Sequence, residues 1–348
     1  MPGLATKAAA LDVHWESAIG DHVIGLCWSP GGSRVAAAPV TGPLAIYCGD
    51  TGERKLDFAG HGFGTAQVAW SPASKAPVLA SCGQDGCIRI WDAAAGRQLA
   101  ELKGGADWVE HLAWSRTGQY LATAAGRKLR MWNLSDPAQP ELLHDYDEHA
   151  STIAGIQWKP GADELAACGY NGLTFWSPTQ HTMLRRFDWK GSMLTLAWSP
   201  DAKYIATGNQ DSTVQFWMMG TGKELQMWGY RAKIRELAWD QKSRYLATGG
   251  SSVAVVWDCS GKGPSGSKPL LLEFHQRLLT QLKFQEEGGL LASGCDEGLV
   301  AVWRPGKDPK PLATAYLATG VSQLAWSPSG RRLAVGTEDG SVQILRAP

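Results

Sequence analysis

Residues 60–92 read GHGFGTAQVAWSPASKAPVLASCGQDGCIRIWD, and this stretch decides the fold. Short apolar runs at 66–70, 78–81 and 87–91 predict three strands, and residues 98–102 predict a fourth. The Ser-Pro pair after Trp70 ends the first strand, because proline cannot donate to a sheet ladder. The sequence Gln84-Asp85-Gly86 supplies a glycine for a tight turn. The stretch therefore predicts one small antiparallel sheet of four strands.

The same pattern recurs eight times along the 348 residues. Each repeat has an aromatic marker, and successive markers lie 40 to 45 residues apart: Trp28, Trp70, Trp114, Trp158, Trp198, Trp239, Phe284 and Trp326. A second marker follows 18 to 21 residues later: Tyr47, Trp91, Trp132, Trp176, Trp217, Trp257, Trp303 and Leu345. Two positions that recur together at this period are typical of the blades of a β-propeller. We number the repeats one to eight by these markers.

We predict an all-β chain with a single propeller over residues 11–346, an N-terminal tail at 1–10 and a surface insertion loop at 259–269. The last repeat has only three strands of its own, so we expect residues 11–15 to pair with residues 341–345 and close the ring. An open ring would leave two exposed strand edges. Eight blades is the main prediction. The alternative is seven, with the first repeat outside the ring because it lacks an Asp-Gly turn.

The second repeat resembles the WD-repeat family, and the resemblance extends over nearly the whole chain. The matching motifs are Gly60-His61, Ser71-Pro72, Leu79-Ala80-Ser81, Asp85-Gly86 and Trp91-Asp92. The chain looks most like stand-alone, bacterial-type members with a single domain. The resemblance implies a buried, structural hydrogen-bonded tetrad made by His61, Ser81, Asp85 and Trp91. A buried aspartate is tolerated only when its acceptor atoms are filled.

Other repeats keep only part of this tetrad. The fourth has His149 but Ala167 where the hydroxyl belongs, and the fifth has Trp189 at the histidine position. The seventh offers His275, Ser293, Glu297 and Trp303. The third and sixth have no acid in the turn, where Gly126 and Ser251 stand.

The composition argues against several classes of function. The chain has 33 basic and 33 acidic residues, so net charge gives no reason to expect nucleic acid or an anionic membrane as the main partner. Its seven cysteines are scattered and show no zinc-ligand spacing, which favours buried thiols in a reducing compartment. No signal peptide or long apolar span is visible. We expect a monomeric cytoplasmic protein without cofactor or metal.

Two sequence patterns resemble those of known binding or catalytic sites. Residues 261–266 match the glycine pattern of dinucleotide-binding loops, but they lie between predicted strands and lack the helix that this site needs. His111 and Glu236 both stand three positions before their markers. Some propellers use acid-base or metal-binding residues at the mouth of their channel. The alternative function is therefore a channel-site enzyme or a small-ligand or metal-linked binding protein.

The resemblance also implies a peptide-binding top face, at the end of the channel where the loops entering each repeat lie. Trp108 is in such a loop, and Lys233 and Leu278 stand at the equivalent position. Glu110 and Arg235 follow two residues further on in their repeats. The residues before the turn acid are Gln84, Tyr170, Gln210, Asp296 and Glu338. Aromatic and arginine side chains among small polar ones are typical of a binding hot spot.

We therefore predict a non-enzymatic scaffold that binds a peptide or loop of a partner protein on its top face. The resemblance to bacterial members suggests a pathway with a metal-handling GTPase. A local basic patch for nucleic acid, at Arg185-Arg186 or Arg331-Arg332, is a third hypothesis that the balanced charge disfavours.

Overall fold

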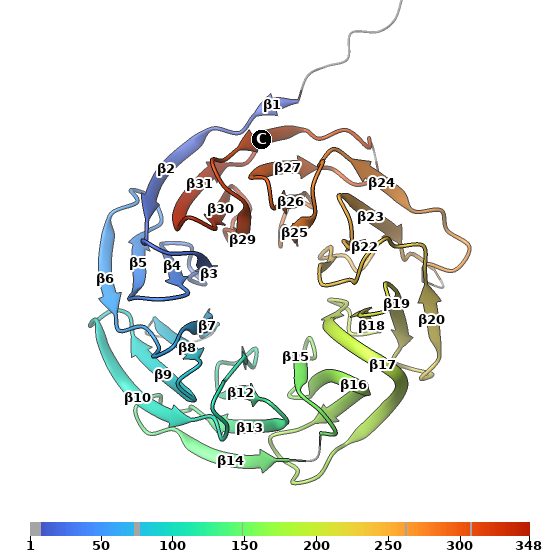
Figure 1. Ribbon diagram of the computed structural model, residues 1–348. Helices are drawn as coiled ribbons and strands as arrows, with labels where there is room; N and C mark the ends of the chain where they lie inside the picture. The colour runs from blue at the N-terminus through green and yellow to red at the C-terminus, as the bar shows by residue number, and fades with distance from the viewer. Residues whose placement is uncertain (1–7, 73–76, 148, 262, 307) are drawn as a thin grey trace, which may run out of the picture.

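The computed structural model describes residues 8–72, 77–147, 149–261, 263–306 and 308–348, which form a ring of small twisted sheets around a common axis (Figure 1). All regular elements in these ranges are β-strands. The described residues form no helix long and apolar enough to cross a membrane. Short apolar runs that pack on neighbouring sheets, and the turn residues between these runs, produce this all-β architecture.

The first four repeats occupy half of the ring. Repeat one is β3 (Val23–Trp28), β4 (Arg34–Pro39), β5 (Leu44–Cys48) and β6 (Arg54–Phe58). Repeat two is β7 (Thr65–Trp70), β8 (Val78–Gly83), β9 (Cys87–Asp92) and β10 (Arg97–Lys103). Repeat three is β11 (His111–Trp114), β12 (Tyr120–Ala125), β13 (Lys128–Asn133) and β14 (Glu141–Tyr146). Repeat four is β15 (Ile153–Trp158), β16 (Leu165–Trp176) and the first part of β17 (Arg185–Trp198).

The remaining repeats complete the circle. Repeat five is the last part of β17 with β18 (Tyr204–Asn209), β19 (Val214–Met218) and β20 (Glu224–Met227). Repeat six is β21 (Leu237–Trp239), β22 (Tyr245–Thr248), β23 (Val253–Asp258) and β24 (Leu270–Glu273). Repeat seven is β25 (Leu279–Phe284), β26 (Leu291–Cys295), β27 (Leu299–Trp303) and β28 (Ala313–Tyr316). Repeat eight is β29 (Val321–Trp326), β30 (Arg332–Thr337) and β31 (Ser341–Arg346), completed by β2 (Val13–Ala18).

The number of blades depends on what is counted. The innermost strands of all eight repeats contact one another in a closed circle, in the order β3, β7, β11, β15, β17, β21, β25, β29 and back to β3. The hydrogen bonds, however, form only seven continuous sheets, because β17 joins repeats four and five into one six-stranded sheet. Residues 185–188 of β17 pair with β16, and residues 193–198 pair with β18. The prediction of eight thus describes the repeats, and the alternative of seven describes the continuous sheets. The reason expected for seven is wrong, since the first repeat lies inside the ring.

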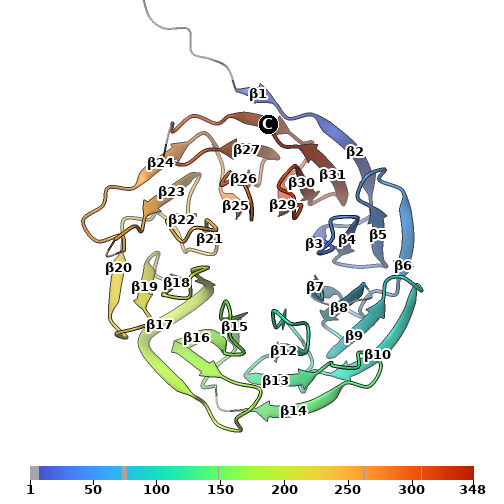
Figure 2. The ribbon, with the colours of Figure 1, turned by 180° about the vertical axis from the view of Figure 1, so that it is seen from behind.

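The N-terminal segment closes the ring, as predicted. Strand β2 pairs antiparallel with β31, from Val13 opposite Leu345 to Ala18 opposite Ser341. The closing strand begins two residues later than expected. The tail is also shorter than expected, because β1 (Ala9–Ala10) pairs in parallel with β28 of the seventh repeat. Both views place β1 and β2 on the outer rim (Figures 1 and 2).

The core consists of eight hydrophobic clusters, one at each boundary between successive repeats. The cluster at the closure combines Trp15 and Tyr47 with Val342 and Ile344 from the other end of the chain. Each sheet is therefore apolar on both faces and needs its neighbours, which is why a single repeat cannot stand alone. The insertion loop, whose described part is 259–261 and 263–269, also packs partly inward, because Gly263 and Pro264 are buried.

Indole hydrogen bonds connect the first markers around the ring. The Nε1 of a marker donates to the backbone carbonyl one residue before the marker of the preceding repeat. Trp28 reaches Ala325 in this way at 3.0 Å, and Trp158 reaches Ala113 at 2.9 Å. The same bond is made by Trp70, Trp114, Trp239 and Trp326. Trp198 is the exception among the tryptophan markers, since its buried Nε1 has no hydrogen-bond partner among the described residues.

Candidate functional site

The loops that enter the repeats lie at the same end of the ring as the turns between the second and third strands. This follows from the antiparallel order of four strands, and we call this end the top face. Backbone hydrogen bonds connect each of these turns to the next entering loop. Thr65 N donates to Val40 O at 2.8 Å, and Ile153 N donates to Gly126 O at 2.9 Å. The top-face loops are therefore held by the neighbouring repeat.

Large apolar side chains are exposed on three successive repeats of the top face. Phe63 in the second repeat is 87% exposed, Trp108 in the third is 56% exposed and Tyr170 in the fourth is 54% exposed. We call these three residues the aromatic arc. The other exposed large apolar residues of the described chain, apart from Leu278 on the top face, lie on or directly after outermost strands: Val13, Leu142, Trp228, Leu271 and Tyr316. The top face thus holds the only run of exposed aromatic residues on consecutive repeats in the described ranges.

Phe63 was missed by the sequence analysis, although its setting is informative. It stands between Gly62 and Gly64, and its φ of 64° lies in the left-handed region that a phenylalanine rarely adopts. The loop is fixed in this shape because Gly62 N donates to the Asp85 carboxylate at 3.0 Å. Strained backbone with an exposed aromatic side chain is typical of a binding position. A phenylalanine between two glycines in an entering loop was the signal in the sequence.

Trp108 stands on a loop that is anchored on both sides. Gly104 N donates to Gly86 O at 2.8 Å, and Val109 N donates to Gly83 O at 3.0 Å. Val109 is fully buried beneath the loop, so the indole next to it is directed away from the core. The structure places Trp108 in an exposed position on a top-face loop, and its contact with a partner stays a prediction.

The other predicted contact residues are spread around the ring. Arg235 and Lys233 are exposed, and neither has an ion-pair partner among the described residues. They belong to the sixth repeat, so they do not form one compact cluster with Trp108 of the third. Glu110 is half-buried, and this burial raises its pKa. The remaining residues lie on the top-face loops of four repeats, the second, fifth, seventh and eighth: Gln84, Gln210, Leu278, Asp296 and Glu338.

The predicted tetrad of the second repeat is joined by hydrogen bonds beneath the top face. His61 Nδ1 lies 2.9 Å from the Asp85 carboxylate, and its Nε2 lies 2.8 Å from Ser81 Oγ. Trp91 Nε1 donates to the same Ser81 oxygen at 2.9 Å. Arg89 adds a contact that was not predicted, since its guanidinium donates to Asp85 at 2.8 Å. Burial alone would raise the pKa of Asp85, but the bonds from His61, Gly62 and Arg89 outweigh it and lower this pKa to about 2.

Comparison with known proteins places these features in a family. The family described as "WD domain, G-beta repeat" matches residues 52–92, 96–133, 182–218 and 222–258. The family described as "Anaphase-promoting complex subunit 4 WD40 domain" matches residues 312–348. The chain is a WD-repeat β-propeller. The four tetrad residues of the second repeat lie within the first of these matches.

The relatives of this WD-repeat chain include cell-cycle and ribosome-biogenesis proteins. "Protein FIZZY-RELATED 2" of Arabidopsis thaliana is 26% identical over 58% of the chain and 42% of the relative. "B-type cell cycle switch protein ccs52A" of Medicago truncatula is 25% identical over 71% of the chain and 52% of the relative. "Ribosome biogenesis protein WDR12 homolog" of Ixodes scapularis is 24% identical over 46% and 38%. The chain spans about half the length of these relatives or less.

A solved structure shows the same architecture. The crystal structure of the computationally designed Ika8 protein superimposes with a TM-score of 0.80 over 95% of this chain and 98% of the designed one. At 20% sequence identity this likeness concerns the fold alone. The relatives above come from two plants and a tick, so they lend no support to the expected bacterial type or to a metal-handling GTPase pathway.

Two WD-repeat blades form the hydroxyl-centred part of the tetrad, three hydrogen-bonded residues without an acid, using residues that the sequence analysis did not recognise. In the fourth repeat the hydroxyl comes from Thr174, near the end of β16. This hydroxyl is hydrogen-bonded to His149 Nε2 at 3.0 Å and to Trp176 Nε1 at 2.9 Å. In the sixth repeat Tyr230 stands at the histidine position and bonds Thr248 and Trp257, both at 2.9 Å. The Gly229-Tyr230 pair in place of Gly-His was the available signal.

The other histidine tetrad is incomplete. In the seventh repeat His275 Nε2 contacts Ser293 Oγ at 2.7 Å, and Trp303 Nε1 donates to that oxygen at 2.8 Å. Glu297 does not reach His275, whose Nδ1 is buried without a partner. Burial lowers the pKa of His275 to about 4, so the ring stays neutral in the folded protein at neutral pH.

The channel residues of the alternative hypothesis are not joined to each other. His111 is on β11 of the third repeat, and Glu236 precedes β21 of the sixth. Burial lowers the pKa of His111 and raises that of Glu236. No hydrogen bond or ion pair connects the two within the part of the chain that the structure describes. In those ranges no group of three His, Cys, Asp or Glu side chains is arranged to hold a metal ion.

Proposed function

We propose that this WD-repeat propeller is a non-enzymatic scaffold that binds a short peptide or loop of a partner protein on its top face. The observation that carries the proposal is the aromatic arc of Phe63, Trp108 and Tyr170 on three consecutive repeats. Aromatic side chains supply a large apolar area with few rotatable bonds, which makes them frequent binding hot spots.

The rigidity of the arc supports the same proposal. The loops of Phe63 and Trp108 are held by backbone bonds to the preceding repeat and by the Asp85 carboxylate. A surface that is already ordered loses little conformational entropy when a flexible segment docks on it. A relative at 26% identity, "Cell division cycle 20.1, cofactor of APC complex" of Arabidopsis thaliana, carries a name that describes work with a protein complex.

Affinity capture from the native host, read out by mass spectrometry, tests the proposal. The test variant combines Phe63→Ala with Trp108→Ala, and a second variant carries Arg235→Glu. The matched control is Trp228→Ala, because this tryptophan is 75% exposed and follows β20 at the outer edge. We expect the arc variant to reduce capture of a specific partner at least about tenfold, as loss of a hot spot does. We expect the control to retain it.

The melting temperature of each variant separates binding from folding. Exposed side chains contribute little to stability, so all three variants should melt within a few degrees of wild type. A partner that the arc variant still captures at the wild-type level would contradict the top-face assignment. Loss with Arg235→Glu but not with the arc variant would move the binding site to the sixth repeat.

A further inference from the structure

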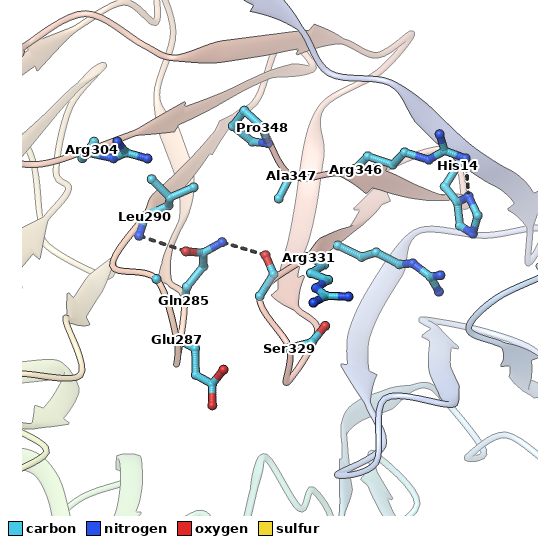
Figure 3. Close-up of a pocket in the computed structure, with 13 residues that line it drawn as sticks. His14, Gln285, Glu287, Leu290, Arg304, Ser329, Arg331, Arg346, Ala347 and Pro348 are labelled. Carbon is cyan, nitrogen blue, oxygen red and sulfur yellow. Dashed lines mark hydrogen bonds between the residues drawn. The ribbon is translucent and has the colours of Figure 1, made fainter.

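The bottom face, opposite to the top-face loops, has a pocket between the seventh and eighth repeats (Figure 3). Its volume is about 780 Å³. The turns after β25 and β29, the ends of β27 and β31, and the closing strand β2 form its walls. Four arginines and a histidine line it: Arg304, Arg331, Arg332, Arg346 and His14. We call this site the bottom pocket.

The positive charge of the bottom pocket is largely uncompensated. The guanidinium groups of Arg304 and Arg331 have no hydrogen bond or ion pair with any described residue. Arg332 is paired with Asp50 at 2.6 Å. Among the described residues of the lining, Glu287 is the only carboxylate side chain, and no ion pair involves it. The pocket therefore holds at least two free guanidinium groups.

The sixth repeat shows what these positions do when their charges are balanced. Arg244, five residues after its marker, pairs with Asp258, one residue after the second marker, at 2.8 Å. The same two positions in the eighth repeat are Arg331 and Arg346. The backbone is equivalent, since Cys259 N donates to Arg244 O and Ala347 N donates to Arg331 O.

An acid is thus replaced by a base in two adjacent repeats. The position after the second marker is Asp92 in the second repeat and Asp258 in the sixth, but Arg304 in the seventh and Arg346 in the eighth. Like charges placed together in a partly enclosed site are unfavourable unless an anion joins them. Arg304 and Arg346, the two arginines that replace the acid, line the same pocket.

We propose that the bottom pocket binds a small molecule that carries phosphate groups. Guanidinium groups bind phosphate oxygens through paired, charge-assisted hydrogen bonds. The volume lies within the range of small-molecule sites, roughly 300 to 1,000 Å³. This proposal is independent of the top-face function, because the site lies at the other end of the ring and uses other residues.

His14 lines the bottom pocket and contacts one of its arginines. Its Nδ1 accepts a hydrogen bond from the Arg346 guanidinium at 3.2 Å, and this bond helps to position the guanidinium.

The position of the bottom pocket connects ligand binding to ring closure. His14 is on β2 and Arg346 on β31, the two strands that pair to close the ring. Arg304 comes from the neighbouring seventh repeat. A ligand held by Arg304 and Arg346 would connect the last two repeats next to the closing strand, and a ligand that binds only the folded state raises its stability.

Isothermal titration calorimetry of the full chain at low salt tests the proposal. The probes are pyrophosphate, inorganic phosphate and ribose 5-phosphate, which separate a diphosphate, the free ion and a phosphate ester. We expect saturable binding of at least one probe. Arg304→Ala and Arg331→Ala should each weaken it at least about tenfold, as expected for loss of a charge-assisted contact. The matched control is Arg116→Ala, an exposed arginine without a partner in the first-to-second-strand turn of the third repeat, on the same face.

Melting temperatures without and with pyrophosphate show whether the variants fold. Without ligand, Arg331→Ala should melt at or above the wild-type temperature, because it removes a repelling charge. With pyrophosphate, wild type and Arg116→Ala should gain several degrees, and Arg331→Ala should gain none. The proposal is wrong if no phosphate probe binds wild type at low salt. It is also wrong if Arg304→Ala and Arg331→Ala both bind the probes as tightly as the control Arg116→Ala and wild type do. Preference for an acidic peptide such as hexaglutamate over every phosphate probe would also overturn it.

Discussion

In the second repeat the Asp85 carboxylate receives a bond from the His61 ring, one from Gly62 N and one from the Arg89 guanidinium. Each of these contacts favours the ionised carboxylate over the protonated one. One acidic side chain thereby fixes the histidine beneath the blade and the loop that presents Phe63. The stability of the tetrad and the orientation of Phe63 in the aromatic arc therefore both depend on the Asp85 carboxylate.

Asp85→Asn should lower the free energy of unfolding by about 2 kcal/mol at pH 7, from the difference between a folded pKa of about 2 and an unfolded one of about 3.9. Because the folded pKa is the lower one, the carboxylate contributes fully above pH about 4. Its contribution is lost as pH falls from about 4 to about 2. Urea unfolding at several pH values measures this, with exposed Asp163→Asn as control. If the difference in unfolding free energy between wild type and Asp85→Asn stayed constant down to pH 2, the ionised carboxylate would not be the cause of the stabilisation.

The residues that the sequence analysis identified and missed differ in a physical way. His61, Ser81, Asp85 and Trp91 stand at the positions of the WD-repeat motif, so the resemblance to the family could place them. In the fourth repeat Ala167 takes the place of the hydroxyl residue, and Thr174 in the same long strand β16 supplies the hydroxyl instead. A match of motif positions cannot show such an exchange, because it depends on which side chains meet in the fold.

At the scale of strands, the indole bonds between markers fix each innermost strand against the one before it. Six tryptophan markers make this bond, whereas the buried Nε1 of Trp198 has no partner. The natural chain therefore contains both a bonded marker and an unbonded one in neighbouring repeats.

Trp158→Phe and Trp198→Phe remove the same atoms from two nearly buried sites. Only Trp158→Phe also breaks a hydrogen bond, at 2.9 Å, and leaves the Ala113 carbonyl without it. We expect it to cost about 1 kcal/mol more than Trp198→Phe, whose unpaired indole N–H is removed. Equilibrium unfolding in urea compares the two variants. Equal costs, or a larger cost for Trp198→Phe, would show that these bonds do not stabilise the ring.

The boundary between repeats four and five was not predictable from the strand pattern. The chain runs without a break as β17 from Arg185 to Trp198, although the sequence pattern predicted two separate repeats here. The Gly-His entering loop is replaced here by Asp188-Trp189-Lys190. Without the loop glycine, extended backbone runs from one blade into the next, and the two sheets merge.

At the scale of the whole molecule, the ring is closed by residues from both ends of the chain. Trp15 on β2 is nearly buried, donates from its Nε1 to Gly49 O at 2.9 Å, and packs on Tyr47. The N-terminal strand thus completes the sheet of the eighth repeat and packs against that of the first. The sequence predicted this closure because three strands of the last repeat needed a fourth.

Trp15→Ala should therefore cost about 3 to 5 kcal/mol, as loss of a large core aromatic does. Trp228→Ala, the exposed control, should change stability by less than about 0.5 kcal/mol. Thermal and urea unfolding measure both variants. If the two variants had the same stability, the closure would contribute nothing to the fold.

We propose that a partner docks on the aromatic arc, and site-specific photo-crosslinking is the measurement that tests this docking. A photoreactive phenylalanine analogue replaces Phe63, Trp108 or Tyr170 in turn, and Leu142 on β14 or Tyr316 on β28 as exposed controls. After irradiation in the native host, we predict one shared crosslinked partner from the three arc positions and none from the controls. Crosslinks that form only at Leu142 or Tyr316 would contradict the claim.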